Sequence, residues 1–496
     1  MGRTAMQTQT VMFLTELASS VTLSLLLLIP AALLLLYLID RNQSRHALRR
    51  NYPLLARFRY LFEHLGEFFR QYFFAMDREE MPFNRAERSW VYRAAKKVDS
   101  TIAFGSTRDL RATGTVLFAN CAFPKLSEEG VDTGSIVVGP SCRHPYRVTS
   151  VFHMSAMSYG AISAPAVLAL SKGAKSADVW MNTGEGGLSP EHLQGGADIV
   201  FQIGTAKYGV RDSQGRLSPE RLQQVAAHEQ VKMFEIKLSQ GAKPGKGGVL
   251  PGSKVNAEIA RIRAIPEGED SFSPNRHPEV SSPEDLLDLI ERVRSISGKP
   301  VGIKAVIGDH RWLEEFFSVI RTRGEASAPD FIAVDGAEGG TGAAPASLID
   351  YMGLPLRESL PLVVDLLNQF DLRQRIRVVA SGKLINPAQI AWALCVGADF
   401  AASARGFMFS LGCIQAMQCN KNTCPTGITT HDKKLQRGLV VSNKRKRVAN
   451  YARSVRTEVA MIAHACGVTE PRQLQRRHCR IVQADGSSVA LDELYP

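Results

Sequence analysis

Between residues 150 and 406 the chain repeats one pattern of hydrophobic and polar positions. A short apolar run, often rich in β-branched residues, ends in a polar or glycine-containing loop, and a segment with helical spacing follows. Strands that alternate with helices in this way are expected to pair in parallel. The predicted strands cover residues 150–154, 179–182, 199–203, 233–238, 301–306, 331–335, 377–381 and 399–403.

Eight parallel strands predict an α/β fold of the closed (β/α)8 TIM barrel type. An open, doubly wound sheet is the alternative, but its G-x-G-x-x-G fingerprint is missing where a first strand meets a helix. Residues 240–298, between the fourth and fifth strands, form a much longer connection than usual. Loops of that length are usually functional or disordered.

The N-terminal region carries a different pattern, an uncharged and leucine-rich run from residue 17 to 39. A helix of about 20 apolar residues spans a bilayer, and membrane helices tolerate a proline such as Pro30. A cleaved signal peptide is the competing interpretation, but the run is long for one and lacks an A-x-A site. Four arginines between residues 41 and 50 follow the run, and one precedes it. The positive-inside rule then predicts a single-pass protein of the inner (plasma) membrane with its catalytic domain in the cytoplasm.

These patterns predict four parts of the chain. Residues 1–50 form a transmembrane anchor with a basic flank. Residues 51–145 form a helical and loop arm, whose aromatic amphipathic helix is expected to pack on the membrane or to cap the next domain. Residues 146–465 form the barrel domain, and residues 466–496 form a small C-terminal extension.

Composition adds limits on the partners. Hydrophobic residues make up 45% and charged residues 22%, as in ordinary globular proteins. The net charge of +12 is concentrated after residue 40 and between residues 433 and 480. Such basic segments are either solvated faces or surfaces that attract an anionic membrane or an acidic partner. We expect no nucleic acid partner, because no recognition motif accompanies the charge.

Three of the eight cysteines are clustered, with five and then four residues between Cys413, Cys419 and Cys424. The other five are scattered, which argues against a disulfide framework and for a reducing compartment. The spacing does not suit a structural zinc site, whereas thiolates on a turning loop can hold an iron–sulfur cluster. Three unrelated thiols remain the alternative, and a distant ligand such as Cys395 would make a four-iron cluster possible.

The predicted strand ends carry the other candidate chemistry. In a (β/α)8 barrel the active site lies at these ends, and a phosphate often binds after strands seven and eight. Glycines that let the backbone approach a phosphate, and cations that balance its charge, occur at both positions. They are Ser381, Gly382 and Lys383 after strand seven, and Arg405 and Gly406 after strand eight.

Two predicted strands contain a lysine, Lys237 and Lys304. A buried ammonium costs several kcal/mol unless it is paired, so each of them needs an anionic ligand or a carboxylate if it faces the barrel interior. If it faces the helices instead, it is a snorkelling or ion-paired residue.

The sequence resembles the FMN-binding synthase domain of the glutamate synthase family, in particular stand-alone relatives that lack the glutaminase domain. The resemblance covers roughly residues 120–440. It is carried by SAMSYGAIS (155–163), NTGEGG (182–187), EIKLSQGAKPGKGGVLPGSKV (235–255), SPED (282–285), VDGAEGGTGAAP (334–345) and CIQAMQCNKNTCPTGI (413–428).

The resemblance implies FMN and a 3Fe-4S cluster on Cys413, Cys419 and Cys424. It implies that FMN meets Ser155, Met157 and Ser158 under the ring, and Gln202 and Lys237 at its polar edge. Gly340 follows strand six among the cofactor-binding residues, and Ser381, Gly382, Lys383, Arg405 and Gly406 would hold the phosphate. The catalytic candidates are Lys304, expected to pair with a substrate carboxylate, Glu185 in the ammonia-delivery loop, and Asp335 and Glu338 after strand six.

The implied reaction is the condensation of ammonia with 2-oxoglutarate and the reduction of 2-iminoglutarate to L-glutamate. Reducing equivalents are expected from ferredoxin or a separate reductase, and ammonia is expected free or from a partner because no glutaminase domain is recognised. Two motifs depart from the family: Ser-Gly-His-Asp reads Asp335-Gly-Ala337-Glu338, and Ala-Asp-Gly-Gly reads Ala380-Ser381-Gly382-Lys383. An FMN enzyme for another 2-oxo, 2-hydroxy or N-substituted amino acid, such as an N-methylglutamate synthase, is therefore the alternative. A membrane-bound electron-transfer or scaffold subunit is a third hypothesis.

Overall fold

The computed structural model describes residues 2–43, 46–99, 101–126, 128–131, 133–250, 252 and 255–496. Arg45 of the basic flank, and Pro251, Ser253 and Lys254 of the glycine- and lysine-rich motif, lie outside the described residues. The chain divides into two compact units, with the boundary between Ala86 and Glu87. This boundary falls inside the segment predicted as one arm from 51 to 145.

The first unit is helical. It consists of α1 (Gly2–Asn42), α2 (Ala47–Asn51), α3 (Leu55–Phe69) and the π-helical turn η1 (Arg70–Phe74). From Met12 to Asn42, α1 is long and apolar enough to cross a membrane, and an 18-residue window within it has a mean hydropathy of 2.6 and no buried residue. Pro30 lies within this helix.

The second unit is built on a closed barrel of eight parallel strands. The strands follow one another around the barrel in chain order, with β13 pairing back to β4. They are β4 (Phe152–Met154), β5 (Met181–Asn182), β6 (Ile199–Ile203), β7 (Val231–Lys237), β10 (Val301–Ala305), β11 (Phe331–Asp335), β12 (Arg377–Ser381) and β13 (Phe400–Ser403). Every predicted strand is thus confirmed, and the doubly wound alternative is excluded.

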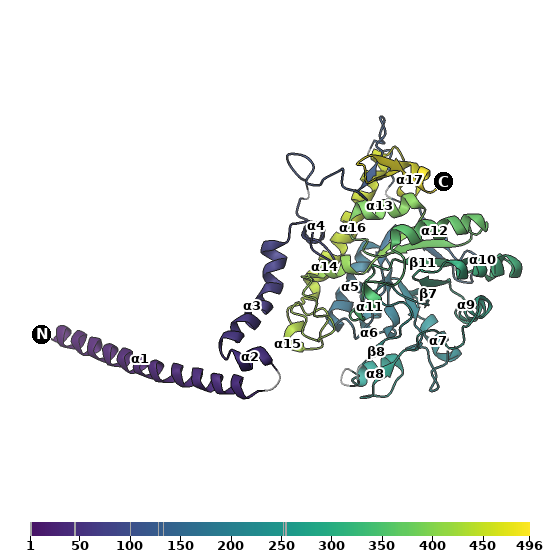
Figure 1. Cartoon of the computed structure of the whole chain (residues 1–496). Coiled ribbons are helices and arrows are strands. Elements are labelled where there is room, and N and C mark those ends of the chain that lie inside the picture. The colour runs from purple at the N-terminus through teal and green to yellow at the C-terminus, as the bar shows by residue number, and fades with distance from the viewer. Residues whose placement is uncertain are drawn as a thin grey trace. The chain divides into compact units, whose positions relative to one another are not determined.

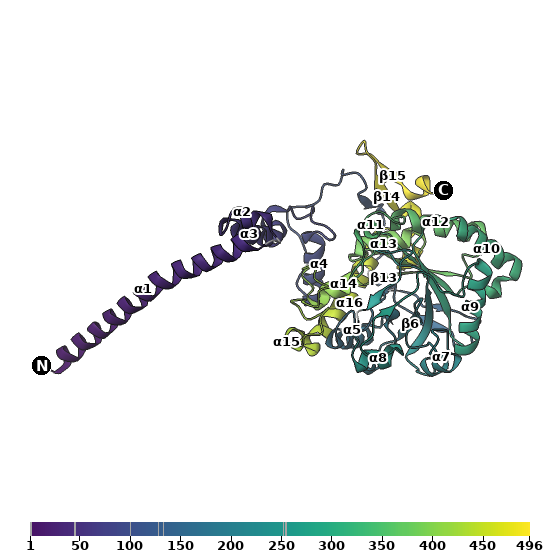
Figure 2. The ribbon, with the colours of Figure 1, turned by 60° about the horizontal axis from the view of Figure 1, so that its bottom comes forward.

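Helices connect successive strands and surround the barrel (Figures 1 and 2). They are α5 (Ala164–Ala177), α6 (Pro190–Gly195), α7 (Pro219–Ala226), α9 (Pro283–Ser297), α10 (Arg311–Arg323), α12 (Leu356–Gln369) and α13 (Pro387–Val396). Short polar side chains fix where several of them begin. Ser282 and Asp285 form a capping box at α9, and Asn386 and Gln389 form another at α13.

The long connection from 240 to 298 is largely structured. It contains the two-stranded pair β8 (Val249–Leu250) and β9 (Ser271–Phe272), with α8 (Ala257–Arg263) between them, and it ends in α9. The loop between β7 and β8 therefore stands on a scaffold of its own at the C-terminal ends of the strands.

A hairpin closes the opposite end of the barrel. It is formed by β2 (Ile136–Val138) and β3 (Tyr146–Val148), which pair antiparallel. Val138 and Val148 pack on a buried apolar cluster that includes Trp180, Phe331 and Phe400, all at the beginnings of barrel strands. The hairpin therefore covers the N-terminal ends of the strands with apolar side chains.

The remaining elements cover the side of the barrel where it closes. Helix α16 (Val441–Ala465) packs against α5, α13 and α14 (Arg405–Leu411). The C-terminal strands β14 (Cys479–Val482) and β15 (Ser488–Ala490) form a sheet with β1 (Val116–Phe118). The short elements are α4 (Arg85–Lys96), α11 (Ala346–Ile349), α15 (Lys433–Gln436), α17 (Leu491–Leu494), and the 3-10 turns η2 (Gly184–Gly186), η4 (Glu325–Ser327), η5 (Pro471–Gln473) and η6 (Arg476–His478).

Candidate active site at the barrel mouth

Lys304 of β10 points into the barrel. Its Nζ lies 3.5 Å from Oδ2 of Asp335 and 3.4 Å from Oγ of Ser155, and all three residues are buried. Oγ of Ser155 in turn lies 3.3 Å from Oγ of Ser381. The structure thus joins the ends of four barrel strands through one ammonium and its partners. The possibility that Lys304 faces the helices is excluded.

Asp335 also fixes the loop that follows β7. Its Oδ2 accepts a hydrogen bond from the backbone N–H of Gly241 at 2.9 Å. A buried carboxylate is stable when a cation and hydrogen-bond donors compensate it, and Asp335 has both. It therefore links the barrel interior to the glycine- and lysine-rich loop.

A second buried carboxylate, Glu235, organises the neighbouring strand ends. Its Oε1 accepts hydrogen bonds from Nδ2 of Asn182 at 2.8 Å and from Nε2 of Gln202 at 2.7 Å. Oδ1 of Asn182 accepts from the N–H of Gly184 at 2.9 Å. Gln202 is thereby held in one orientation, which is a requirement for a residue that recognises a cofactor edge.

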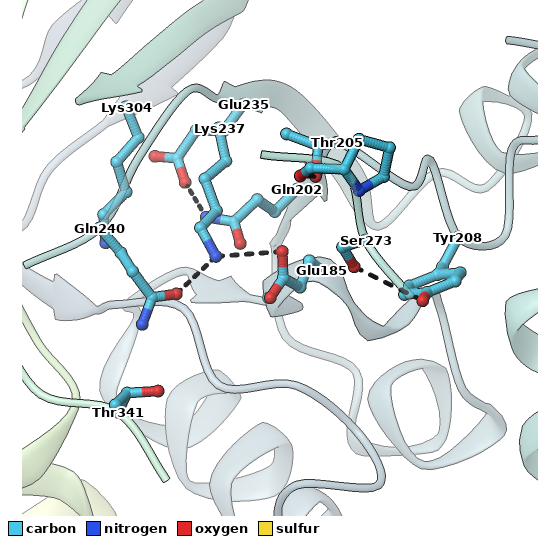
Figure 3. A network of polar contacts seen from close by, with 12 residues as sticks. Glu185, Gln202, Thr205, Tyr208, Glu235, Lys237, Gln240, Ser273, Lys304 and Thr341 are labelled. Atoms are coloured by element: carbon cyan, nitrogen blue, oxygen red, sulfur yellow. Dashed lines mark hydrogen bonds and ion pairs between the residues drawn. The ribbon is translucent and has the colours of Figure 1, made fainter. Parts of the chain in front are cut away.

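Lys237 makes a separate ion pair at the rim. Its Nζ lies 3.0 Å from Oε2 of Glu185 and donates to Oε1 of Gln240, as Figure 3 shows. The backbone carbonyl of Lys237 lies 3.0 Å from Nε2 of His277. Burial lowers the pKa of His277 to about 4, so the imidazole is neutral near pH 7 and donates from Nε2 to that carbonyl.

A pocket opens beside this pair and encloses about 320 Å³ of empty space, part of it open to solvent. Its lining includes Glu185, Lys237, Gln240, Lys243 and Lys246, so three cations face one carboxylate. Burial alone would raise the pKa of Glu185, but Lys237 and Lys243 outweigh it and the net shift is downward. Burial lowers the pKa of Lys243, against the attraction of Glu185. The pocket has the charge excess that an anionic ligand needs.

The residues predicted to hold a phosphate lie together where three strand ends meet. A Cβ on Gly340 would overlap the guanidinium of Arg405, and a Cβ on Gly382 would lie 3.0 Å from the backbone nitrogen of Gly336. Gly382 and Lys383 are both left-handed, with φ of 136° and 49°. A side chain at 382 is disfavoured by the nearby backbone and by the positive φ, whereas a side chain at 340 would push the guanidinium of Arg405 aside. The close backbone approach and the two cations, Lys383 and Arg405, are features that suit a phosphate.

Glu338 lies on the phosphate side of the mouth. Both of its carboxylate oxygens accept from the N–H of Leu356 at the first residue of α12, at 3.1 and 3.0 Å. Burial raises its pKa, although those hydrogen bonds and Lys383 act in the opposite direction. The structure does not bring Glu338 to Lys304, with which the sequence grouped it, and gives it a helix-capping role.

The loop after β4 carries Ser155, Met157 and Ser158, and it packs against the loop of Glu185. A Cβ on Gly184 would lie 2.6 Å from the nitrogen of Ser158. The same β4–α5 loop contacts the end of the cysteine-rich loop. Oγ of Ser163 donates to the carbonyl of Gly427 at 2.7 Å, and Nε2 of His431 lies 2.8 Å from the carbonyl of Gly160.

The cysteine-rich loop itself is tightly wound. Gln415, Met417 and Asn422 adopt left-handed φ of 58°, 52° and 61°, which non-glycine residues keep only where the surroundings enforce it. Burial raises the pKa of Cys413 to about 11, and the charges of the other two thiols add to it. Burial would raise the pKa of Cys424, but hydrogen bonds with Thr426 and Thr429 lower it to about 7. In the described part of the chain, no three His, Cys, Asp or Glu side chains are grouped closely enough to hold a metal ion.

A profile of the conserved region in glutamate synthase matches residues 118–469, which include the whole barrel and the cysteine-rich loop. The chain belongs to the glutamate synthase family. It is a glutamate synthase-like oxidoreductase.

Relatives in the glutamate synthase family cover most of the chain. The "glutamate synthase large subunit-like protein YerD" of Bacillus subtilis is 42% identical over 498 residues, covering 92% of this chain and 94% of that protein. The "archaeal-type glutamate synthase [NADPH]" of Thermotoga maritima is 32% identical over 353 residues, covering 71% of this chain and 66% of that protein. Among solved structures, a mutant flavocytochrome b2 with pyruvate bound has a TM-score of 0.47 and 15% identity, covering 82% of this chain and 87% of that one.

Sequence reasoning missed several residues of the glutamate synthase-like site. Asn182 and Glu235 were seen only as strand ends, yet they orient Gln202. Gln240, Lys243 and Lys246 line the rim pocket. The density of glycine and lysine directly after a strand that itself ends in a lysine was the signal that could have found them.

Proposed function

We propose that this glutamate synthase-like protein binds FMN across the barrel mouth and reduces 2-iminoglutarate, formed from 2-oxoglutarate and ammonia, to L-glutamate. One observation carries the proposal. A phosphate cradle at Gly340, Gly382 and Arg405 lies at the same rim as the buried cluster of Lys304, Asp335 and Ser155. A cofactor with a phosphate at one end and a polar ring at the other matches that arrangement.

FMN, when bound, supplies the hydride for the imine carbon. Arg405, Lys383 and the backbone of Gly382 and Gly340 hold its phosphate. Ser155, Met157 and Ser158 support the ring from the β4–α5 loop. Because Lys304 is the ammonium beside Ser155, we assign to Lys304 the charge compensation at the ring edge that the sequence had given to Lys237.

Lys237 then takes the role first given to Lys304, that of binding a substrate carboxylate. It shares its pocket with Lys243 and Lys246, and this excess of cations over Glu185 suits a dicarboxylate such as 2-oxoglutarate. Glu185 keeps Lys237 in place, and its lowered pKa keeps Oε2 ionised, so that Oε2 can accept a hydrogen bond from the incoming ammonia.

The structure does not group the thiols of Cys413, Cys419 and Cys424 as metal ligands. The thiol loop is nevertheless proposed to hold a 3Fe-4S cluster on these three cysteines, which would have to converge on it, and the cluster would supply one-electron transfer to the barrel mouth. Support comes from the enforced left-handed turns of the loop and from its hydrogen bonds to the β4–α5 loop. A cluster there would lie next to the residues assigned to the ring of FMN.

An acidic electron carrier, such as ferredoxin or a separate reductase, is proposed to dock beside the thiol loop. Lys444 at the start of α16 lies against Gly412: a Cβ added to Gly412 would lie 2.9 Å from Nζ of Lys444. Burial, Arg447 and Lys96 all lower the pKa of Lys444, so several cations share this surface. Reduction by such a carrier is expected to slow steeply with ionic strength, and Lys444→Glu is expected to slow it at low salt.

The N-terminal helix α1 is proposed to anchor the protein in the inner membrane, with the barrel in the cytoplasm. Extraction of isolated membranes with carbonate would test this. The full chain should stay with the lipid, and release into the soluble fraction would contradict the anchor.

The decisive experiment on function uses the anaerobically purified full chain. Released flavin is identified by chromatography, iron and sulfide are quantified, and the oxidised protein is examined by electron paramagnetic resonance. The loaded protein then receives a low-potential donor, 2-oxoglutarate and ammonium. Stoichiometric L-glutamate is expected, and its absence in fully loaded protein would refute the proposed reaction.

One observation favours a second substrate. Glu338 replaces the last residue of the family's Ser-Gly-His-Asp motif and is engaged by the first turn of α12, so the motif presents no acidic side chain to the Lys304 cluster from this position. An N-substituted product, for example N-methylglutamate from methylamine, is the alternative. Parallel assays with methylamine and with 2-hydroxy acids separate the two functions.

A further inference from the structure

The aromatic segment after the apolar helix has an apolar face that the structure leaves exposed. Five apolar residues of α3 and η1 follow one another at spacings of three, four or seven positions, so they align on one side of a helix. This face consists of Leu55, Phe58, Phe62, Phe69 and Phe73, which are 70%, 58%, 66%, 44% and 74% exposed. Isolated exposed apolar side chains are common, but a continuous aromatic stripe marks an interaction surface.

The other side of α3 packs against neighbouring residues of the same helical unit. Ala56 is buried at 4% exposure, and the ring of Tyr60 meets His46 with centroids 5.4 Å apart. The guanidinium of Arg49 in α2 lies 4.8 Å from the centroid of the Tyr60 ring. Since α2 covers the Ala56 and Tyr60 side, the phenylalanine face is turned away from the rest of this helical unit.

A buried ion pair fixes α3 to the end of the apolar helix. Asp40, near the last turn of α1, is 1% exposed and accepts from Nε of Arg57 at 2.7 Å and from Nη2 of Arg57 at 2.8 Å. It also accepts from the N–H of Leu54 at 3.1 Å. Within this unit α3 therefore leaves α1 in a defined, sharply turned direction (Figure 1).

We infer that α3 and η1 form a second membrane contact, an amphipathic helix that lies in the interface of an anionic bilayer. A bilayer is favoured over a protein partner because the face begins 13 residues after the end of a helix able to span one. Arginines 41, 49, 50 and 59 accompany it and match anionic headgroups in charge. The inference rests on the proposed anchor only in that α1 brings α3 to the lipid.

Single tryptophan reporters in the full chain test this inference. Phe62→Trp reports on the apolar face, His64→Trp on the opposite side of the same helix, and Leu26→Trp on the apolar helix. Each variant is reconstituted into vesicles whose acyl chains carry bromine, which quenches only tryptophans within reach of the chains. The unchanged protein gives the background from its four native tryptophans.

We expect strong quenching and a blue-shifted emission for Phe62→Trp, and quenching near background for His64→Trp. The difference should grow when phosphatidylglycerol replaces part of a phosphatidylcholine bilayer. Equal, background-level quenching of Phe62→Trp and His64→Trp, with Leu26→Trp quenched, would overturn the inference and leave the anchor standing. An unquenched Leu26→Trp would instead refute the anchor, and Phe62→Trp would still decide for α3. A blue-shifted but unquenched Phe62→Trp would point to a protein cover and would likewise overturn the inference.

Discussion

Lys304 and Lys237 lie directly beside each other in the barrel, as register partners on β10 and β7. Their ammonium groups nevertheless go to different places. Lys304 pairs with Asp335 inside the barrel, whereas Lys237 pairs with Glu185 at the rim pocket. Two adjacent buried cations would repel each other, so each has its own carboxylate. The pairing divides the mouth into an interior polar cluster held by strands and a rim pocket held by loops.

Lys304→Met should have the largest effect. It leaves Asp335 as an uncompensated buried carboxylate, which costs about 3 to 5 kcal/mol of unfolding free energy. We expect turnover to fall by about 100-fold or more, since a preorganised charge at the reacting centre is lost. Denaturant unfolding and steady-state rates measure the two effects.

The double variant Lys304→Met, Asp335→Asn is the matched control. It should recover most of the stability and none of the turnover. Recovery of turnover together with stability would mean that Lys304 acts only by supporting the fold.

Lys237→Met should affect substrate binding more than the fold. We expect kcat/KM for the 2-oxo acid to fall by about 10- to 100-fold, as for a lost charge-assisted contact. Because Lys237 holds the pKa of Glu185 down, that pKa should rise, and the acid limb of the pH–rate profile should move to higher pH. Lys246→Met is the control: it removes a pocket charge without removing the partner of Glu185, so kcat/KM should fall and the acid limb should stay.

Gly340→Ala tests the phosphate cradle, which lies outside both lysine pairs. The added Cβ must displace the guanidinium of Arg405. Overpacking of this kind costs about 1 to 3 kcal/mol, so we expect FMN to bind about tenfold more weakly, measured by flavin fluorescence on titration of the flavin-free protein. Gly342→Ala adds a methyl group where nothing lies within 4 Å and should bind FMN normally. Equal affinity in both variants would contradict the assignment.

The last prediction concerns acid stability away from the lysines. Burial lowers the pKa of His192 to about 3, whereas the unfolded chain has the ordinary value of 6.5. The unfolded state therefore binds the proton first, and stability is lost as pH falls from about 6.5 towards 3. Between pH 7 and 4, the free energy of unfolding of His192→Asn should fall by about 3 kcal/mol less than that of the unchanged protein, as measured by urea unfolding curves. An unchanged pH dependence would show that the folded and unfolded states bind the proton of this histidine equally well.

Sequence was sufficient for the barrel because its strands are buried on both faces and read as uninterrupted apolar runs. Residues 331–335 and 377–381 were predicted with the bounds that β11 and β12 have. Strand register likewise carries Lys304 and Asp335 inward without further information. The side chains at the rim were less predictable. Glu338 follows β11 closely in sequence, yet it caps α12, and the partners of Lys237 come from loops whose paths depend on α8 and on the β8–β9 pair.

The hydrogen bonds from Ser163 to Gly427 and between His431 and Gly160 tie the last turn of the thiol loop to the segment under the proposed flavin ring. The proposed flavin and iron–sulfur sites would then be assembled together rather than independently. If the thiol loop is not properly folded, residues 155–158 would be held less firmly. The amount of flavin that stays bound would then depend on the state of the thiols, even in the absence of electron transfer.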